Sequence, residues 1–296
     1  MRIIRPQVRV RHLWALMRPK QLVKNFLVFA APLATGVFTD LNTVFQLIFG
    51  FTVFCLLSSC TYIINDIHDR REDALHPVKR HRPIAAGLVT VSGSLFLVGL
   101  FACSSIALSL LLPIEAAVIA FLYIFSTTLY SFVVKKIPYL EMILLASGFV
   151  LRASYGSLIA GLEPSNLFIL CIFLGSLFVV VEKRLAEKRR FIDKNWWPRK
   201  VLYRYQIDRL LSIALGSGLL FLITYASWAF SVSFGPSDVN IWRLASVFPI
   251  GFAIVQFHLI AQRDKNDSPE EILLSNKLAV ASCGMWLALS VLAVAG

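Results

Sequence analysis

The stretch LFLVGLFACSSIALSLLL, residues 95–112, decides the class of fold. It contains no charged residue and no alternation between apolar and polar positions. A helix needs about 20 apolar residues to cross the hydrocarbon core of a bilayer, whereas strands of a membrane β-barrel alternate over about ten residues. This stretch, and a second one at 210–230, therefore predict membrane-spanning helices.

The composition extends this prediction to the whole chain. Of its 296 residues, 57% are hydrophobic and 16% are charged, and the mean hydropathy is +0.72. Soluble domains average about 25% charged residues. These values exclude a soluble globular enzyme, a disordered protein and a disulfide scaffold. The five cysteines lie in apolar runs without metal-ligand spacing, so we interpret them as small hydrophobic residues.

Nine apolar runs are bounded by charged or turn-forming residues. They lie at 22–39, 44–64, 89–112, 116–134, 139–161, 166–182, 210–233, 241–261 and 278–295. We predict an all-α polytopic membrane protein with nine transmembrane helices, in which residues 1–296 form one integral-membrane domain.

The distribution of Lys and Arg predicts the orientation, because loops on the cytoplasmic side carry an excess of these residues. With the N-terminus in the cytoplasm, 27 of the 29 Lys and Arg residues fall on that side. They lie in segments 1–24, 66–88, 134–138, 182–209 and 262–277. We therefore expect a cytoplasmic N-terminus, and we expect the chemistry in cytoplasmic loops near 66–88, 182–209 and 262–277.

An acidic motif, NDIHDRRED at 65–73, follows the second predicted span. In a helix, Asp66, Asp69 and Asp73 share a face, and Asn65 lies four residues before Asp69. Carboxylates on one face repel each other unless a cation neutralises them. Mg²⁺ is commonly held by one or two carboxylates together with the phosphate groups of a substrate. The motif therefore predicts a site for magnesium and a diphosphate.

Basic residues follow the acidic motif. Lys79, Arg80 and Arg82 can donate charge-assisted hydrogen bonds to phosphate. The alternative is a solvated loop in which the aspartates pair with Arg70, Arg71 or Lys79. We favour the binding site because acids for a metal and bases for a phosphate occur together.

The pattern N-D-x-x-D-x-x-x-D at 65–73, followed by R-P-I-A-A-G at 82–87, resembles the first signature of the UbiA superfamily of intramembrane transferases. The longer pattern D-x-x-H-P-x-K-R-x-R-P-I-A-A-G at 73–87 resembles the superfamily branch that contains the decaprenyl-phosphate phosphoribosyltransferases. Weaker matches lie at 18–21, 24–25, 130–135, 148–153, 183–187 and 269–271.

The resemblance implies a nine-helix bundle and a magnesium-bound diphosphate substrate. The metal ligands that it implies are Asn65, Asp66, Asp69 and Asp73. For the branch, it implies transfer of 5-phosphoribose from phosphoribosyl pyrophosphate (PRPP) to a polyprenyl phosphate.

The sixth predicted span departs from the superfamily pattern. Many members carry a second D-x-x-x-D there, whereas this chain has Glu182 and Glu187, which lie about 140° apart around a helix. Lys183 and Glu187 do share a face. We expect a mixed basic and acidic surface that contacts a sugar phosphate, and we assign catalytic roles to Lys183 and Glu187 alongside Asp66 and Asp69. The alternative is a simple helix pair between Lys183 and Glu187.

Arg152 lies about midway along the fifth predicted span, where an arginine costs about 2.5–3.5 kcal/mol unless it is paired or hydrated. We interpret it as a ligand for a phosphate or a carboxylate, with a structural partnership between helices as the alternative. The other candidate substrate-binding residues are Lys24, Asn25, Asp73, Lys79, Arg80, Arg82, Tyr130, Lys135, Glu141 and Arg184.

Three hypotheses for the function follow. We favour a magnesium-dependent phosphoribosyltransferase in a bacterial cell membrane, with PRPP, a polyprenyl phosphate and the bilayer as partners, no nucleic acid, and a possible homo-oligomeric state. The first alternative is transfer of a prenyl chain from its diphosphate to an aromatic or quinone-precursor acceptor. The second is a transporter or lipid-binding scaffold.

Overall fold

A computed structural model describes residues 10–37, 40–76, 79–192, 200–233, 240–263 and 276–295, and these ranges contain helices and no strand. The helices, with η marking the 3₁₀ type, are α1 (Val10–Met17), α2 (Pro19–Leu22), η1 (Val23–Phe29), α3 (Ala30–Thr35), α4 (Leu41–Leu75), η2 (Lys79–His81), α5 (Val91–Ser109), α6 (Ile114–Phe132), η3 (Val134–Lys136), α7 (Leu140–Ile159), α8 (Asn166–Phe191), η4 (Lys200–Arg204), α9 (Ile207–Ser233), α10 (Ile241–Ala245), α11 (Val247–Arg263) and α13 (Lys277–Ala295). The predicted all-α fold is confirmed.

Within the described ranges, eight helices are long and apolar enough to cross a membrane, and they correspond to the last eight predicted runs. The first predicted run, 22–39, instead forms the broken helix α2–η1–α3. Its ten α-helical and seven 3₁₀ residues span roughly 29 Å, close to the thickness of a hydrocarbon core. The crossing by this segment, and with it the count of nine, stays a prediction.

Pro32 explains why this segment breaks. A proline inside a helix cannot donate to the carbonyl four residues earlier, and its ring clashes with that carbonyl, which here belongs to Val28. The Val28 carbonyl instead packs against α7, where a Cβ added to Gly156 would lie 1.7 Å from the Val28 oxygen. Pro32 and Gly156 therefore allow the backbones of η1 and α7 to touch.

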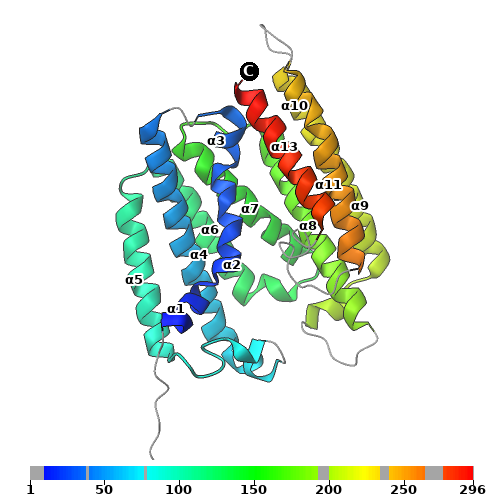
Figure 1. The fold of residues 1–296 in the computed structure, drawn as a ribbon. Coiled ribbons are helices and arrows are strands. Elements are labelled where there is room, and N and C mark those ends of the chain that lie inside the picture. Colours follow the sequence, from blue (N-terminus) through cyan, green and yellow to red (C-terminus); the bar gives the residue numbers. More distant parts are fainter. Residues whose placement is uncertain are drawn as a thin grey trace, which may run out of the picture.

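Helix α7 lies at the centre of the bundle (Figure 1). It packs against η1, α3, α4, α6 and α8. Of its apolar membrane window 56% is buried, against 11% for α5, which packs on the outside of α4. Helices α8, α9, α11 and α13 form the other side of the bundle (Figure 1). Side chains on α7 are therefore placed to face a space between the two sides.

Helix α4 carries the acidic motif. Asp40 caps its N-terminus, and the Asp40 carboxylate accepts hydrogen bonds from the backbone N–H groups of Thr43, at 2.9 Å, and of Asn42. These bonds, those from Thr43 most, lower the pKa of Asp40. Its 35 residues extend over roughly 52 Å, so the last turns project beyond an apolar core of about 30 Å. The helix continues through Asp73, which meets the condition under which the sequence placed the aspartates on one face.

The predicted loops are shorter than expected from the sequence. Helix α4 continues to Leu75 and α8 to Phe191, so the segments 66–88 and 182–209 are helical over their first residues. Residues 77–78 of the acidic motif's continuation and 269–271 of the weaker matches lie outside the described ranges, as does most of 262–277.

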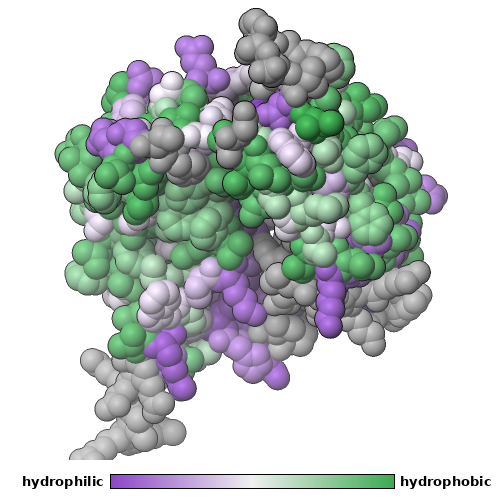
Figure 2. All heavy atoms as spheres, turned by 45° about the horizontal axis from the view of Figure 1, so that its top comes forward, coloured by the Kyte–Doolittle hydropathy of each residue, from purple (hydrophilic) through white to green (hydrophobic). Residues whose placement is uncertain are grey.

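The outer surface of the bundle is apolar. Figure 2 shows hydrophobic residues over most of its flanks and hydrophilic residues concentrated toward its ends. Large side chains such as Phe96 (73% exposed) and Phe121 (66% exposed) point outward. Exposed apolar surface on this scale suits lipid rather than water. The membrane protein predicted from composition has the surface that a bilayer requires.

The contact between η1 and α7 gives a stability prediction. We expect Gly156→Ala to destabilise the protein, because its Cβ would overlap the Val28 carbonyl and overpacking costs about 1–3 kcal/mol or more. Thermal melting in detergent should show a midpoint lowered by several degrees. Gly99→Ala in α5 is the control, because a Cβ added there meets no described atom within 4 Å beyond its own turn of helix. Equal midpoints for the two variants would contradict the close contact.

Candidate functional site

A cavity of about 1470 Å³ lies between α4, α6, α7 and α8, at the end of the bundle where α4 ends. Its charged and larger polar lining residues are Arg18, Gln21, Lys24, Tyr62, Asn65, Asp69, Glu72, His76, Lys79, Arg82, Tyr123, Tyr130, Lys135, Lys136, Arg152, Lys183, Arg184, Tyr203 and Arg204. Ten of these are Lys or Arg and two are Asp or Glu. The cavity is therefore strongly positive and suited to anions.

One face of α4 turns acidic and amide groups toward the cavity. Asn65, Asp69 and Glu72 line it, at positions i, i+4 and i+7 of the helix. Asp66 and Asp73 are almost fully buried beside this face, each 3% exposed, and neither lines the cavity. The predicted common face of three aspartates is thus divided into Asp69 on the cavity wall and two aspartates behind it.

Basic residues neutralise the two aspartates behind the wall. Arg82 Nη1 donates to Asp66 Oδ1 at 2.9 Å and to Asp73 Oδ2 at 2.6 Å. Arg18 also donates to Asp66, and Lys79 Nζ lies 3.9 Å from Asp73 Oδ1. Arg18 adopts a left-handed backbone conformation, with φ 52°, which an L-residue adopts at a cost. Through Arg18 and Arg82, the segment before α2 and the segment after α4 both bind the aspartates of the motif.

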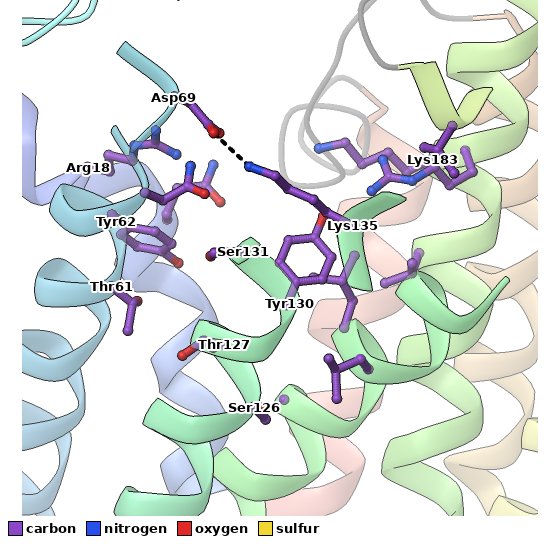
Figure 3. Close-up of a pocket in the computed structure, with 18 of the residues that line it drawn as sticks. Arg18, Thr61, Tyr62, Asp69, Ser126, Thr127, Tyr130, Ser131, Lys135 and Lys183 are labelled. Atoms are coloured by element: carbon purple, nitrogen blue, oxygen red, sulfur yellow. Dashed lines mark hydrogen bonds and ion pairs between the residues drawn. The ribbon is translucent and has the colours of Figure 1, made fainter. Parts of the chain in front are cut away.

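Asp69 pairs across the cavity. Lys135 Nζ, from η3, donates to Asp69 Oδ1 at 2.7 Å. Figure 3 shows this pair, and it shows Lys183 entering the same space from the opposite wall. The structure therefore brings Asp69 of α4, Lys135 of η3 and Lys183 of α8 to one site. The sequence analysis had named all three as site candidates.

The acids of α8 turn away from this site. Glu182 pairs with α11, where His258 Nδ1 lies 2.5 Å from Glu182 Oε1. Arg184 Nη1 donates to Glu187 Oε2 at 2.9 Å. Neither glutamate lines the cavity. Glu187, which we assigned a catalytic role, lies behind the wall with Arg184, and α8 presents basic groups to the cavity.

A buried network around Glu141 holds this wall in place. Arg184 donates to both carboxylate oxygens of Glu141, with 3.0 Å for the Nη2–Oε2 bond. Tyr205 donates to Oε1 at 2.8 Å and Tyr130 to Oε2 at 3.2 Å. Burial, and then the neighbouring Glu141, raise the pKa of the Tyr205 hydroxyl far above its ordinary value, so it remains a donor. Glu141 is fully buried and does not line the cavity.

Arg152 occupies the deep end of the cavity. Its guanidinium donates to Asn25 Oδ1 at 2.9 Å, to Tyr123 Oη at 2.8 Å and to the Gly148 carbonyl at 2.8 Å. It is 6% exposed, and it has no carboxylate partner among the described residues. Asn25 is buried and serves this contact without lining the cavity. The structural partnership between helices that we gave as the alternative is present, and the role of Arg152 as a ligand for an anion stays a prediction.

The remaining predicted residues fall into two groups. Lys24, Lys79 and Arg82 line the cavity, and Lys24 donates to Gln21 Oε1 at 2.6 Å. Arg80 lies exposed on the surface, where its Nε is 3.4 Å from His81 Nε2.

The sequence analysis missed several cavity residues as candidates, among them Arg18, Glu72, Tyr203 and Arg204. Glu72 had a signal, since it lies seven residues after Asn65 and three after Asp69 in the same helix. Arg18, Tyr203 and Arg204 reach the cavity from the start of α2 and from η4, and no spacing within the sequence relates those segments to α4.

The α4 wall offers some, but not all, of the oxygen ligands that Mg²⁺ needs. Among the described residues, no three His, Cys, Asp or Glu side chains gather closely enough to hold a metal by themselves. The wall does offer the Asn65 amide oxygen and the Asp69 carboxylate, with Asp66 and Asp73 adjacent. Mg²⁺ is typically bound by one or two carboxylates plus substrate phosphates. The donor set therefore fits a metal that arrives with a phosphorylated ligand.

The Glu141 network gives a second prediction. We expect Glu141→Gln to lower stability, because removing one partner of a buried ion pair costs about 3–5 kcal/mol. The melting midpoint should fall by several degrees, whereas Glu115→Gln, at an exposed position in the first turn of α6, should leave it unchanged. A normal midpoint combined with weaker substrate binding would instead support the substrate-binding role that we assigned to Glu141 from the sequence.

Comparison with known proteins finds relatives that match over most of the chain. The model of the UbiA prenyltransferase family matches residues 26–278. Decaprenyl-phosphate phosphoribosyltransferase from Corynebacterium glutamicum is 34% identical over 282 residues, which cover 94% of this chain and 85% of that protein. The protein of the same name from Mycolicibacterium smegmatis is 33% identical over 282 residues, covering 92% of this chain and 88% of that protein.

The fold agrees as well. The structure of a UbiA homolog from Archaeoglobus fulgidus bound to GPP and Mg²⁺ matches with a TM-score of 0.69 at 16% identity, covering 96% of this chain and 100% of that one. Sequence similarity over most of the chain and a common helical architecture lead to one conclusion: this chain belongs to the UbiA prenyltransferase family.

Proposed function

We propose that this protein transfers 5-phosphoribose from PRPP to a polyprenyl phosphate of the decaprenyl type and releases pyrophosphate. The observation that carries the proposal is the charge of the cavity, in which ten Lys or Arg residues face two acids. Two polyanionic substrates require such an excess of positive charge. The names of the relatives at 33–34% identity support the same reaction.

The cofactor in this proposal is Mg²⁺, held by Asn65 and Asp69 on the cavity wall with Asp66 and Asp73 adjacent. When bound, it supplies charge neutralisation to the departing pyrophosphate. Lys135 and Arg82, now bound to carboxylates, are positioned to donate to the phosphate oxygens instead. Asp66 and Glu187 act as positioning residues, because they touch Arg18, Arg82 and Arg184 rather than the cavity.

The reaction needs little proton transfer from the protein. The bond between the anomeric carbon and the pyrophosphate oxygen breaks, its electron pair leaves with pyrophosphate, and an oxygen of the lipid phosphate bonds to that carbon. The transition state resembles an oxocarbenium ion, as in other glycosyl transfers. The lipid phosphate is already an anion at neutral pH, so positioning and charge stabilisation carry the acceleration. Lys183 and Arg204 line the cavity on the side of α8 and η4 and are positioned to bind the lipid phosphate.

Prenyl transfer from a polyprenyl diphosphate is the alternative, and the direction of the α8 acids argues against it. A second metal for a prenyl diphosphate would use a second acidic pair facing the cavity. Here Glu182 pairs with His258 and Glu187 with Arg184, while Lys183 faces the cavity. A basic wall suits a sugar phosphate better than a second metal.

The proposed location is a bacterial cell membrane, with the cavity open to the cytoplasm. The support for this orientation is the Lys and Arg excess in the segments at the motif end of the bundle. Such an orientation exposes the site to a water-soluble sugar donor while its lipid acceptor remains in the bilayer.

A substrate-pair assay tests the function. Purified protein in lipid nanodiscs receives Mg²⁺, labelled PRPP and polyprenyl phosphate, and we expect the label in the lipid fraction. A parallel reaction supplies polyprenyl diphosphate and 4-hydroxybenzoate. Product from the second reaction alone would decide for prenyl transfer, and product from neither would remove both proposals.

The role of Asp69 gives a third prediction. We expect Asp69→Asn to lower kcat/KM for PRPP by about 100-fold or more, because the oxyanion of the leaving group loses its charge stabilisation. EDTA should abolish turnover of the wild-type protein. Asp208→Asn, at an exposed position in the first turn of α9, is the matched control and should keep wild-type activity. The role would be ruled out if Asp69→Asn kept wild-type kcat/KM and turnover continued in the presence of EDTA.

A further inference from the structure

Hydroxyl groups line the cavity between the acidic motif and Arg152. Thr61 on α4 and Thr127 on α6 both lie on its wall (Figure 3). Contacts on either side relate the two helices: Asp69 meets Lys135 near the mouth at 2.7 Å, and the Ser58 and Tyr123 hydroxyls meet at 3.2 Å deeper in. Thr61 and Thr127 lie between these contacts and face the same part of the cavity.

The protons of both threonines are already used. Thr61 Oγ1 donates to the Ser58 carbonyl at 2.8 Å, and Thr127 Oγ1 donates to the Tyr123 carbonyl at 2.8 Å. A hydroxyl has one donor and two acceptor lone pairs, so these side chains present acceptors to the cavity. Acceptor oxygens repel phosphate oxygens and attract O–H donors. This part of the wall therefore suits neutral hydroxyl groups.

The groups on either side of this wall suit anions. Toward the mouth lie the cations Lys135 and Arg82. At the deep end, Arg152 lines the cavity; three of the five N–H groups of its guanidinium form hydrogen bonds to the described residues. Asn65 and Ser58, which mark the two levels on α4, are seven residues or roughly 10 Å apart. From the mouth to the deep end, the cavity wall thus presents cationic side chains, then the hydroxyl acceptors of the threonines, and then the guanidinium of Arg152.

PRPP has the complementary sequence of groups, with pyrophosphate at one end, phosphate at the other and the ribose hydroxyl groups between. An isoprenoid chain has no O–H donor and would leave the threonine oxygens without a partner. We propose that Thr61 and Thr127 recognise the ribose hydroxyls of the donor and so select a sugar phosphate over a prenyl diphosphate. This inference rests on the proposed function and assigns its sugar specificity to two residues.

Isosteric substitution tests the assignment. Thr61→Val and Thr127→Val keep the branched side chain and remove the acceptor, and each variant is titrated calorimetrically with ribose 5-phosphate and with inorganic phosphate. Loss of one neutral hydrogen bond should weaken ribose 5-phosphate binding about three- to tenfold. Binding of inorganic phosphate should remain unchanged, because the threonines face the sugar.

Thr52→Val is the matched control. Thr52 lies on the same helix and donates to the Ile48 carbonyl at 2.9 Å in the same manner, but it is exposed on the outer surface and does not line the cavity. The assignment is overturned if the two cavity variants bind ribose 5-phosphate as Thr52→Val does, or if both ligands weaken equally. It is also overturned if the wild-type protein binds ribose 5-phosphate no more tightly than inorganic phosphate.

The transfer assay separates this inference from the proposed function. A wild-type protein that transfers nothing from PRPP, yet binds ribose 5-phosphate through both threonines, would end the proposed function and leave the sugar subsite in place. Normal KM values for PRPP in Thr61→Val and Thr127→Val would end the subsite and leave the function in place.

Discussion

Every charge carried into an apolar helix bundle must be paired or solvated, and this constraint governs the end of α4. Asp66 and Asp73 are almost fully buried there, and Arg82 from the following segment binds both. Arg18 reaches Asp66 from the start of the chain. On the other side of the cavity, Arg184 is neutralised by Glu141 and Glu187. These ion pairs connect the two sides of the bundle around one cavity and set the positions of its walls.

The same constraint explains what the cavity is suited to bind. After the buried acids have taken their partners, the lining retains a large excess of Lys and Arg over Asp and Glu. Arg152 is the extreme case, since polar groups but no carboxylate among the described residues hold its buried guanidinium. Phosphate groups would satisfy these cations, and a metal shared with those phosphates would satisfy Asn65 and Asp69. The transfer chemistry then depends on positioned charge rather than on a strong general base.

Much of the fold followed from hydrophobicity alone. Eight of the nine predicted runs form long apolar helices in the described ranges, because an uncharged run of about 20 residues has few alternatives in a bilayer. The first run, predicted as one span, forms a broken helix, because Pro32 interrupts it and its carbonyl partner Val28 packs on Gly156 of α7, more than a hundred residues away. The apolar run predicted only the part of α4 up to residue 64, and the continuation to Leu75 places the motif beyond the apolar core.

The sequence by itself determined which groups are available: helical spacing put Asn65, Asp69 and Glu72 on one face of α4, and it separated Glu182 from Glu187 around α8. Only the tertiary structure decided which groups meet. The partners of Asp66, Asp69 and Glu141 come from the start of α2, from η3 and from α8, and the facing of Thr61 toward Thr127 depends on how α4 and α6 pack. The reason is physical: local spacing specifies direction around one helix axis, whereas contact between helices depends on the packing of the whole bundle.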